Sequence, residues 1–149
     1  MDVHVNVKMV RDGALMPRYE TPGSAGVDLH ACLGADEEIM LTPGQVAKVP
    51  TGLALELPDS GMVALVMARS GLAAKHRLDL ANGVGVIDSD YRGELQVLVR
   101  NLGELPFKIQ HGDRIAQMLF MPVIQARLQR TGELSETERG SGGFGSTGM

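Results

Sequence analysis

The N-terminal residues alternate apolar and polar side chains, which is the period of a strand with one buried face. Val3, Val5 and Val7 occupy the apolar positions. Further short apolar or alternating runs follow, at 26–33, 45–49, 52–57, 62–68, 83–87, 94–101 and 114–123. Turn-forming residues separate them, at 21–23, 43–44, 58–61, 88–93 and 111–113. Many short strands at near-regular spacing predict an all-β fold, a sandwich, barrel or jelly roll.

Two segments depart from the strand pattern. Residues 72–77 predict one short helix, and Ser70 stands where a capping side chain is favoured. From about Thr131 the chain is rich in glycine, has few apolar residues and shows no periodicity. We therefore expect one β domain over 1–131 and a flexible glycine-rich C-terminal arm over 132–149.

Composition narrows the class of protein. Of the 149 residues, 44% are hydrophobic, which suits one domain with a real core. The net charge is −4 with no basic excess. This argues against nucleic acid as a partner, because a phosphate backbone binds clustered Lys and Arg. The single cysteine, Cys32, excludes an internal disulfide and lies in an apolar segment, so we expect a buried thiol.

The N-terminus carries no targeting signal. It begins MDVHV, with an acid and an alternating pattern, and resembles neither a signal peptide nor a transit peptide. No apolar run approaches the roughly 20 residues of a membrane span. The predicted setting is therefore cytoplasmic, without a membrane partner.

A candidate phosphate site lies at the start of the predicted helix. A strand delivers Arg69 and Ser70 to a turn at Gly71. Backbone amides at such a turn attract anions, and arginine offers a planar, permanently charged fork. The same pattern also fits an ordinary helix cap with a surface arginine.

A candidate general base follows the apolar strand at 83–87. Asp88 comes directly after Ile87, so we expect it to be partly desolvated. An acid at the mouth of a strand can accept a proton from water. The alternative is a polar β-turn, for which Asp, Ser and Gly are the expected residues.

Other residues carry weaker signals. Asp28 interrupts an apolar alternation and is either a Mg²⁺-type ligand or a solvent-facing strand residue. Tyr91 and Phe144 lie in glycine-rich turn or tail sequence, where a ring can stack on a base or sugar. Arg139 begins the glycine-rich frame 139–148, which either approaches an anion closely or is an idle tail. The four histidines show no ligand spacing and predict no zinc site.

Taken in order along the chain, these segments resemble the five motifs of the trimeric dUTPases. The segments are PGSAGVDL at 22–29, ARSGLAAK at 68–75, NGVGVIDSDYRG at 82–93, GDRIAQM at 112–118 and RGSGGFGS at 139–146. The resemblance runs from about residue 20 to the C-terminus. Two positions depart from the family pattern: Arg77 stands where a small residue is expected, and Gly83 where a bulkier apolar residue is usual.

The resemblance implies a jelly-roll-like β fold and a homotrimer with active sites between subunits. It implies hydrolysis of dUTP to dUMP and pyrophosphate with Mg²⁺, which keeps uracil out of DNA and supplies dUMP for thymidylate synthesis. Asp88 would be the catalytic base, and Asp28 would hold the metal through water. Tyr91 would pack against the deoxyribose, and Phe144 would cover the uracil.

The remaining implied roles fall into three groups. The phosphate chain would be bound by Arg69, Ser70, Gly71 and Gln117. The uracil edge would be read by Asn82 and the backbone of Gly85, Val86 and Ile87. The γ-phosphate would be closed over by Arg139, Gly145, Ser146 and Thr147.

Three alternatives remain open at this point. One is a dCTP deaminase-related enzyme of the same fold, which would use a pocket glutamate; Glu94 is the nearest to the motif. Another is a non-catalytic dUTP-sensing module that binds another protein. The third is a plain structural β-oligomer, which would leave the ordered motifs unexplained.

Overall fold

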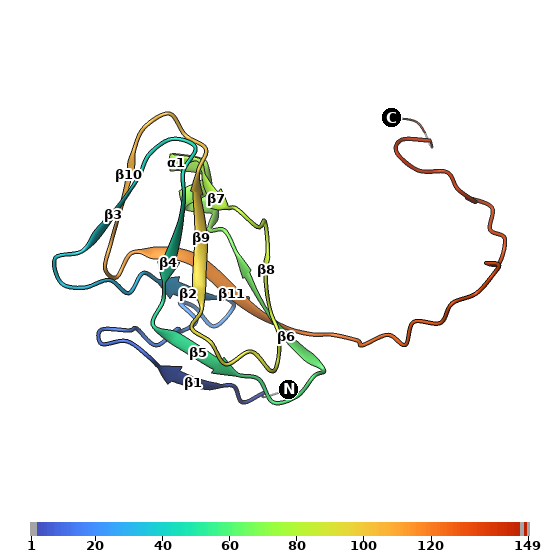
Figure 1. The fold of residues 1–149 in the computed structure, drawn as a ribbon, viewed down its shortest axis with the longest axis horizontal. Coiled ribbons are helices and arrows are strands. Elements are labelled where there is room, and N and C mark those ends of the chain that lie inside the picture. Colours follow the sequence, from blue (N-terminus) through green and yellow to red (C-terminus); the bar gives the residue numbers. More distant parts are fainter. Residues whose placement is uncertain (1–2, 147, 149) are drawn as a thin grey trace.

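The computed structural model describes residues 3–146 and residue 148. Eleven strands and one short helix make up this part of the chain (Figure 1). In chain order the elements are β1 (Asn6–Met9), β2 (Val27–His30), β3 (Glu38–Leu41), β4 (Val46–Pro50), β5 (Leu53–Glu56), β6 (Met62–Met67), α1 (Ser70–His76), β7 (Leu78–Leu80), β8 (Gly85–Ile87), β9 (Gln96–Asn101), β10 (Phe107–Gln110) and β11 (Arg114–Pro122).

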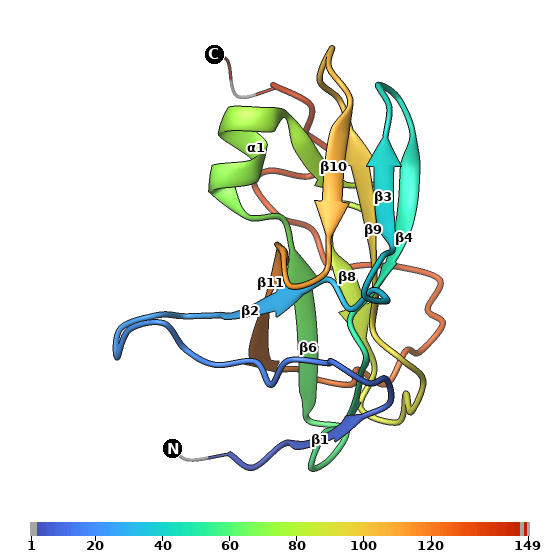
Figure 2. The same cartoon turned by 90° about the vertical axis from the view of Figure 1, so that its left-hand side faces the viewer.

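The strands form four small antiparallel sheets. The largest has the order β2-β11-β6-β8, and the next has the order β4-β9-β7. Two-stranded ribbons β1-β5 and β10-β3 complete the set. Figure 2 shows β4, β9 and the β3-β10 ribbon beside the larger sheet, with α1 at one end of β6. The predicted all-β, jelly-roll-like fold with one short helix is confirmed.

One apolar core joins the sheets. Alternate positions of the strands point into it, as in β9, where Val97 and Val99 are buried between more exposed neighbours. Leu29 of β2, Ile109 of β10 and Met118 of β11 reach the same core. Such alternation fixes the pairing register, because a slip of one residue would expose every buried side chain of a strand. Cys32 is also buried, as predicted, and burial raises the pKa of its thiol.

The sequence pattern found most of the strands and missed three. β3, β7 and β10 were not predicted; they have only three or four residues each. So short a run shows too little alternation to reveal a period. The first strand begins at Asn6 instead of Val3 and is largely exposed, since it pairs only with β5.

The helix starts two residues earlier than the periodicity suggested. α1 begins at Ser70, and Arg69 is the N-cap residue, with no side-chain hydrogen bond to the helix end. The prediction that Ser70 caps this helix is therefore wrong. At the other end Arg77 takes the left-handed conformation with φ 54°, where glycine is usual. This conformation explains why a small residue is expected there.

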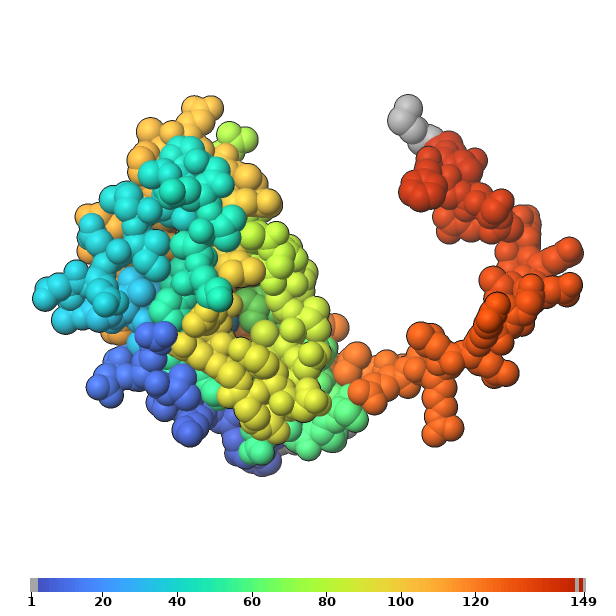
Figure 3. Space-filling model, in the orientation of Figure 1, coloured from blue at the N-terminus to red at the C-terminus, as the bar shows by residue number. Residues whose placement is uncertain are grey.

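The C-terminal segment leaves the body after β11. The amide of Val123 donates to the carbonyl oxygen of Gly61 at 2.8 Å, and the chain then extends away (Figures 1 and 3). Exposed apolar side chains line this segment, at Ile124, Leu128 and Leu134. The departure precedes residue 132, where the sequence pattern placed the start of the arm; the domain division itself stays a prediction. In the described residues, no helix is long and apolar enough to cross a membrane.

Candidate active site

Asp28 lies between two arginines at one end of the large sheet. Its Oδ1 accepts a hydrogen bond from Nε of Arg69 at 2.9 Å, and its Oδ2 accepts one from a terminal nitrogen of Arg114 at 3.2 Å. The side chain of Asp28 is only 12% exposed and that of Arg69 24%. The pair of cations compensates the partly buried carboxylate, which would otherwise be costly to desolvate.

Gln117 joins this group through the strand register. Gln117 of β11 lies opposite Asp28 of β2 on one side and Met67 of β6 on the other. Directly paired residues point to the same face of a sheet, so Gln117 and Asp28 are neighbours there. The Gln117 amide nitrogen donates to the carbonyl oxygen of Ala68 at 2.9 Å, just before Arg69. We call Asp28, Arg69, Arg114 and Gln117 the arginine cluster.

The start of α1 lies open beside the arginine cluster. Ser70 and Gly71 are exposed, and a side chain added at Gly71 would meet nothing within 4 Å. The first turn of the helix contains no acidic residue. An anion that approaches the arginine cluster therefore meets two arginines, whose charge Asp28 offsets only in part, together with exposed backbone at the start of α1.

The predicted metal residue is a single carboxylate. Among the described residues, no group of three His, Cys, Asp or Glu side chains is arranged to hold a metal ion. Both oxygens of Asp28 already accept hydrogen bonds from arginines. This donor set fits Mg²⁺ only in the mode where one carboxylate acts through water and phosphate oxygens supply the remaining ligands.

The segment before Asp88 forms a narrow turn and strand. Gly83 has φ 70°, a conformation that favours glycine over the bulkier residue expected there. Gly85 packs against Val66 of β6; a Cβ at Gly85 would lie 3.2 Å from the Val66 Cβ and 3.5 Å from the Asn82 amide nitrogen. The fold thus brings Asn82 next to the backbone of β8; these are the groups predicted to bind the uracil edge.

Asp88 opens a tight turn at the end of β8. The Tyr91 amide donates to the Asp88 carbonyl oxygen at 3.2 Å, and Arg92 donates to the Ser89 carbonyl oxygen at 2.8 Å. Asp88 is exposed in the isolated chain. The expectation that its position after Ile87 would partly desolvate it is therefore wrong for one subunit. The next residues turn away from the sheet, so nothing from the same chain covers the carboxylate.

The arm residues predicted to bind substrate lie apart from the body. Phe144 is fully exposed and takes φ 52°, and Nε of Arg139 donates to the carbonyl oxygen of Gly142 at 2.9 Å. Gly145 and Ser146 are exposed in the same turn. Thr147, the last predicted γ-phosphate contact, lies outside the described residues.

The dUTPase family profile matches residues 12–148, which is nearly the whole chain. The chain belongs to the dUTPase family. Two bacterial relatives carry the name deoxyuridine 5′-triphosphate nucleotidohydrolase. That of Desulfitobacterium hafniense is 60% identical, over 90% of this chain and 87% of its own length. That of Neisseria meningitidis is 48% identical, over 100% of this chain and 99% of its own length.

Solved dUTPase structures share the fold. A mutant of the dUTPase of Staphylococcus bacteriophage 80alpha with dUpNHpp superposes with a TM-score of 0.88 at 28% identity. The match covers 98% of this chain and 99% of the phage enzyme, so it includes the arm. The family pattern thus extends over body and arm alike.

Within this single dUTPase-family chain, the predicted site residues form separate groups. β8 pairs antiparallel with β6, so that Ile87 lies opposite Ala64 and Gly85 opposite Val66. Asp88 therefore lies near the start of β6, whereas Arg69 follows its end. At about 3.3 Å per residue, these two positions are separated by roughly 20 Å along the strand. The structure brings Asp28, Arg69 and Gln117 together, but not Asp88.

Sequence reasoning missed two functional candidates. Arg114, the second partner of Asp28, was overlooked although it stands within the fourth motif, directly after a turn. Arg11 was also overlooked. It forms an ion pair with Glu94, just beyond the Asp88 turn, and its hydrogen bond holds the pKa of the Glu94 carboxyl below its usual range. No local signal connects residues so far apart in the sequence.

Proposed function

We propose that this chain hydrolyses dUTP to dUMP and pyrophosphate. Membership of the dUTPase family over residues 12–148 is the observation that carries the proposal. The candidate groups that such a reaction needs are all present: a cationic phosphate site, an exposed carboxylate and an aromatic side chain on an extended arm.

The arginine cluster is the proposed phosphate site. Arg69 and Gln117 hold the phosphate chain, with Ser70 and Gly71 beside them. Asp28 orients Arg69 through its 2.9 Å hydrogen bond, so that the guanidinium approaches the phosphate in a fixed plane. Phosphoryl chemistry depends mainly on such positioning and on positive charge near the leaving group.

Asp88 is the proposed general base. Its exposed carboxylate accepts a proton from the attacking water, and the bond between the α- and β-phosphates breaks. The proton leaves water as the oxygen bonds to phosphorus, and pyrophosphate departs with the electron pair of the broken bond. A positioned proton acceptor contributes a rate factor of roughly 10²–10⁴.

The turn and strand that precede Asp88 are the proposed nucleoside site. Asn82 and the backbone of Gly85, Val86 and Ile87 read the uracil edge. A mispaired buried polar group costs roughly 1–3 kcal/mol, which disfavours cytosine. Tyr91 packs against the deoxyribose and leaves no room for a 2′-hydroxyl.

The site is proposed to form between subunits of a homotrimer. Two observations support this arrangement. Asp88 and Arg69 lie at opposite ends of β6, roughly 20 Å apart along the strand. This separation exceeds the distance between the uracil ring and the phosphates of one nucleotide. Asp88 is also exposed in the single chain, and a neighbouring subunit would supply part of the desolvation that sharpens a general base.

The arm is proposed to close over the bound nucleotide. Phe144 covers the uracil, while Arg139 and the amides near Gly145, Ser146 and Thr147 contact the γ-phosphate. Phe144 makes no packing contact with its own body, which supports a partner outside the subunit. Closure excludes water and can gate product release.

Mg²⁺ is the proposed cofactor. Asp28 would hold it through water, while the substrate supplies phosphate oxygens. The metal would neutralise charge that develops on the departing pyrophosphate. The chain's own contribution is to fix the orientation of Asp28 with Arg69 and Arg114.

The cytoplasmic setting also stays a prediction.

Glu94 argues against the deaminase alternative. Its two oxygens accept hydrogen bonds from Arg11, Gly52 and Gln96. The pKa of Glu94 is lowered chiefly by the Arg11 hydrogen bond, so this carboxylate stays charged and occupied. A proton-shuttling glutamate needs the opposite environment.

The decisive test is a pyrophosphate-release assay with dUTP, UTP, dTTP and dCTP, with and without Mg²⁺. The expected result is rapid release from dUTP with the metal and little from the other nucleotides. Ammonia measured with dCTP reports the deaminase alternative. Purified trimer that releases no pyrophosphate from dUTP with Mg²⁺ would refute the proposal.

A further inference from the structure

We propose that the ion pair between Arg11 and Glu94 positions Tyr91 and thereby sets the preference for deoxyribose over ribose. The inference rests on the proposed function, since it assigns Tyr91 to the sugar. Arg11 and Glu94 are positioning residues: neither reaches the nucleotide itself. The inference adds the N-terminal segment, which lies outside the five motifs, to the parts that decide substrate choice.

Tyr91 rests on the backbone at Gly93 and Glu94. Its hydroxyl donates to the Glu94 carbonyl oxygen at 3.1 Å. A Cβ at Gly93 would lie 2.6 Å from the Tyr91 ring carbon Cζ and would collide with the hydroxyl oxygen. The ring therefore lies directly on Gly93, and Tyr91 as a whole is 44% exposed. A shift of the backbone at these two residues moves the ring with it.

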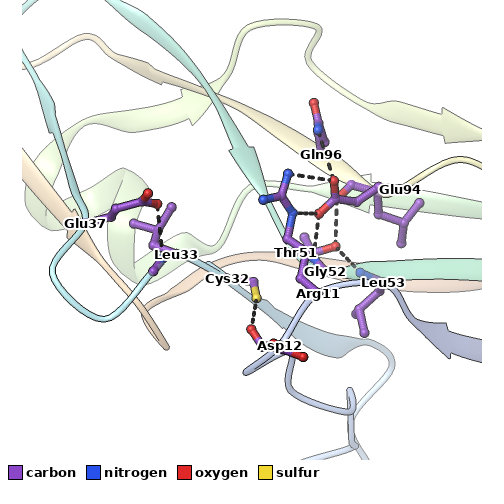
Figure 4. A network of polar contacts seen from close by, with 12 residues as sticks. Arg11, Asp12, Cys32, Leu33, Glu37, Thr51, Gly52, Leu53, Glu94 and Gln96 are labelled. Atoms are coloured by element: carbon purple, nitrogen blue, oxygen red, sulfur yellow. Dashed lines mark hydrogen bonds and ion pairs between the residues drawn. The ribbon is translucent and has the colours of Figure 1, made fainter.

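Four hydrogen bonds from three residues hold the Glu94 carboxylate (Figure 4). Arg11 donates from Nε to Oε1 at 2.5 Å and from a terminal nitrogen to Oε2 at 3.1 Å. The Gly52 amide donates to Oε1 at 3.0 Å, and the Gln96 amide nitrogen donates to Oε2 at 3.3 Å. The Glu94 side chain is 17% exposed, against 47% for Arg11. Two-point pairing with arginine fixes orientation as well as distance.

The partners of Glu94 are themselves anchored. The Val10 amide donates to the Gly52 carbonyl oxygen at 2.8 Å, which fixes the segment that carries Arg11. The Thr51 hydroxyl donates to the Leu95 carbonyl oxygen at 2.7 Å, from a buried position. Three chain segments, around residues 10–11, 51–53 and 94–96, thus meet at Glu94. Tyr91 contacts this junction directly, through its hydrogen bond to the Glu94 carbonyl oxygen.

Steric rejection of ribose depends on the position of the Tyr91 ring. Rejection of a 2′-hydroxyl requires the Tyr91 ring to lie in van der Waals contact with the sugar. A displacement of about 1 Å can change a rate by roughly 10²-fold. Loss of the Arg11–Glu94 pair therefore relaxes this steric rejection before it unfolds the domain.

The experiment measures kcat/KM for dUTP and for UTP with Mg²⁺ in three variants. Glu94→Ala removes all four hydrogen bonds to the carboxylate and is expected to lower the dUTP/UTP ratio about tenfold. Glu94→Gln keeps one acceptor oxygen, and Arg11→Lys keeps the charge but loses the planar fork of the guanidinium. The dUTP/UTP ratios of both variants should therefore lie between those of Glu94→Ala and the wild type. If Glu94→Ala does not fold, these two variants provide the test.

A matched control is the Arg100–Asp79 pair. Arg100 also donates two hydrogen bonds to one carboxylate, at 2.9 and 2.6 Å, between β9 and β7. Arg100→Ala should lower Tm in the manner of Arg11→Lys or Glu94→Ala and keep the ratio within about twofold of the wild type. Tyr91→Ala should remove the selectivity, and Glu94→Ala added to it should then change the ratio no further.

The outcomes separate the two proposals. Wild-type protein that fails to hydrolyse dUTP overturns the proposed function and this inference with it. Active, selective wild type with an unchanged ratio in Glu94→Ala, Glu94→Gln and Arg11→Lys overturns only the positioning role. In that case the Arg11–Glu94 pair would be a structural tie like Arg100–Asp79.

Discussion

The arginine cluster and the arm both belong to the dUTPase motifs, yet they are in opposite physical states. In the cluster, Asp28, Arg69 and Gln117 are hydrogen bonded within the chain and partly buried. In the arm, Phe144 is fully exposed and the hydrogen bond of Arg139 is local. The difference has its origin in the elements that carry the residues.

Strands hold the cluster in place before substrate arrives. The register of β2, β11 and β6 places Asp28, Gln117 and Met67 side by side, so little entropy remains to be lost on binding. The arm is rich in glycine, and its apolar side chains Leu134 and Phe144 are not buried against the body, so we expect binding to order it. We infer that the cluster contributes affinity and the arm contributes closure.

The largest expected effect is at Asp88, which lies in neither region. Asp88→Asn keeps the shape of the turn but cannot accept the proton from water, so kcat should fall by roughly 10²–10⁴. Folding and affinity for a non-hydrolysable dUTP analogue should persist, as circular dichroism and calorimetry would report. Asp36→Asn, at another exposed carboxylate, is the control. Unchanged turnover in Asp88→Asn would remove Asp88 from its role.

Truncation of the chain after Thr137 tests the comparison between the arginine cluster and the arm directly. A chain that ends at Thr137 lacks Arg139 and Phe144 but keeps the body and its sheets. Turnover should fall about 10²-fold or more, because the γ-phosphate contacts and water exclusion are lost. Sedimentation should show the same oligomer as the full chain. A truncated enzyme with a normal rate would contradict closure by the arm.

Arg69→Lys tests the arginine cluster. Lysine keeps the charge but cannot bind Asp28 and a phosphate with one planar fork. KM for dUTP should rise roughly 10- to 100-fold, since a hydrogen bond to a charged group is lost. Arg18→Lys is a suitable control, because Arg18 forms an exposed pair with Glu20. Equal KM in both variants would mean that the cluster does not hold the phosphates.

Phe144→Ala isolates the aromatic contact of the arm. Stacking on a base contributes roughly 1–3 kcal/mol, so kcat/KM should fall about tenfold. Phe144→Tyr retains the ring and should behave like the wild type. Since Phe144 is fully exposed in the free chain, Tm without nucleotide should be unchanged in both variants. A Tm loss in Phe144→Ala would reveal packing of the ring in the free protein.

The smallest expected effect is on thermal stability, through the residue that ends α1. Arg77 ends α1 with φ 54°, which costs a residue with a Cβ about 1–2 kcal/mol. Arg77→Gly relieves this cost, and part of the gain is offset by the entropy of glycine in the unfolded chain. Tm should rise by about 3 °C. Arg77→Ala keeps the Cβ and should give no such rise.

Much of the fold followed from local patterns. The strands β2, β6, β9 and β11 were predicted because each lies within a longer alternating or apolar run, at 26–33, 62–68, 94–101 and 114–123. β3, β7 and β10 were missed because they are short and gain stability from their sheet partners rather than from their own sequence. The helix cap was wrong because Arg69, not Ser70, takes the N-cap position.

The chain's sequence by itself determined the residue types of the site and their order. The motif residues Asp28, Arg69, Asp88 and Phe144 could be read from short stretches, since each stands in a local frame of glycines or strand residues. Cys32 could be assigned to the core in the same way. Such properties depend on neighbours in the chain, which the sequence displays directly.

Only the tertiary structure decided which of these residues meet. Strand pairing brings Arg69 and Arg114 onto Asp28, brings Arg11 onto Glu94, and leaves Asp88 roughly 20 Å from Arg69 along β6. These arrangements depend on the register of strands that lie far apart in the chain. Register is fixed by burial of whole strand faces in one shared core, and no local stretch of sequence contains that information.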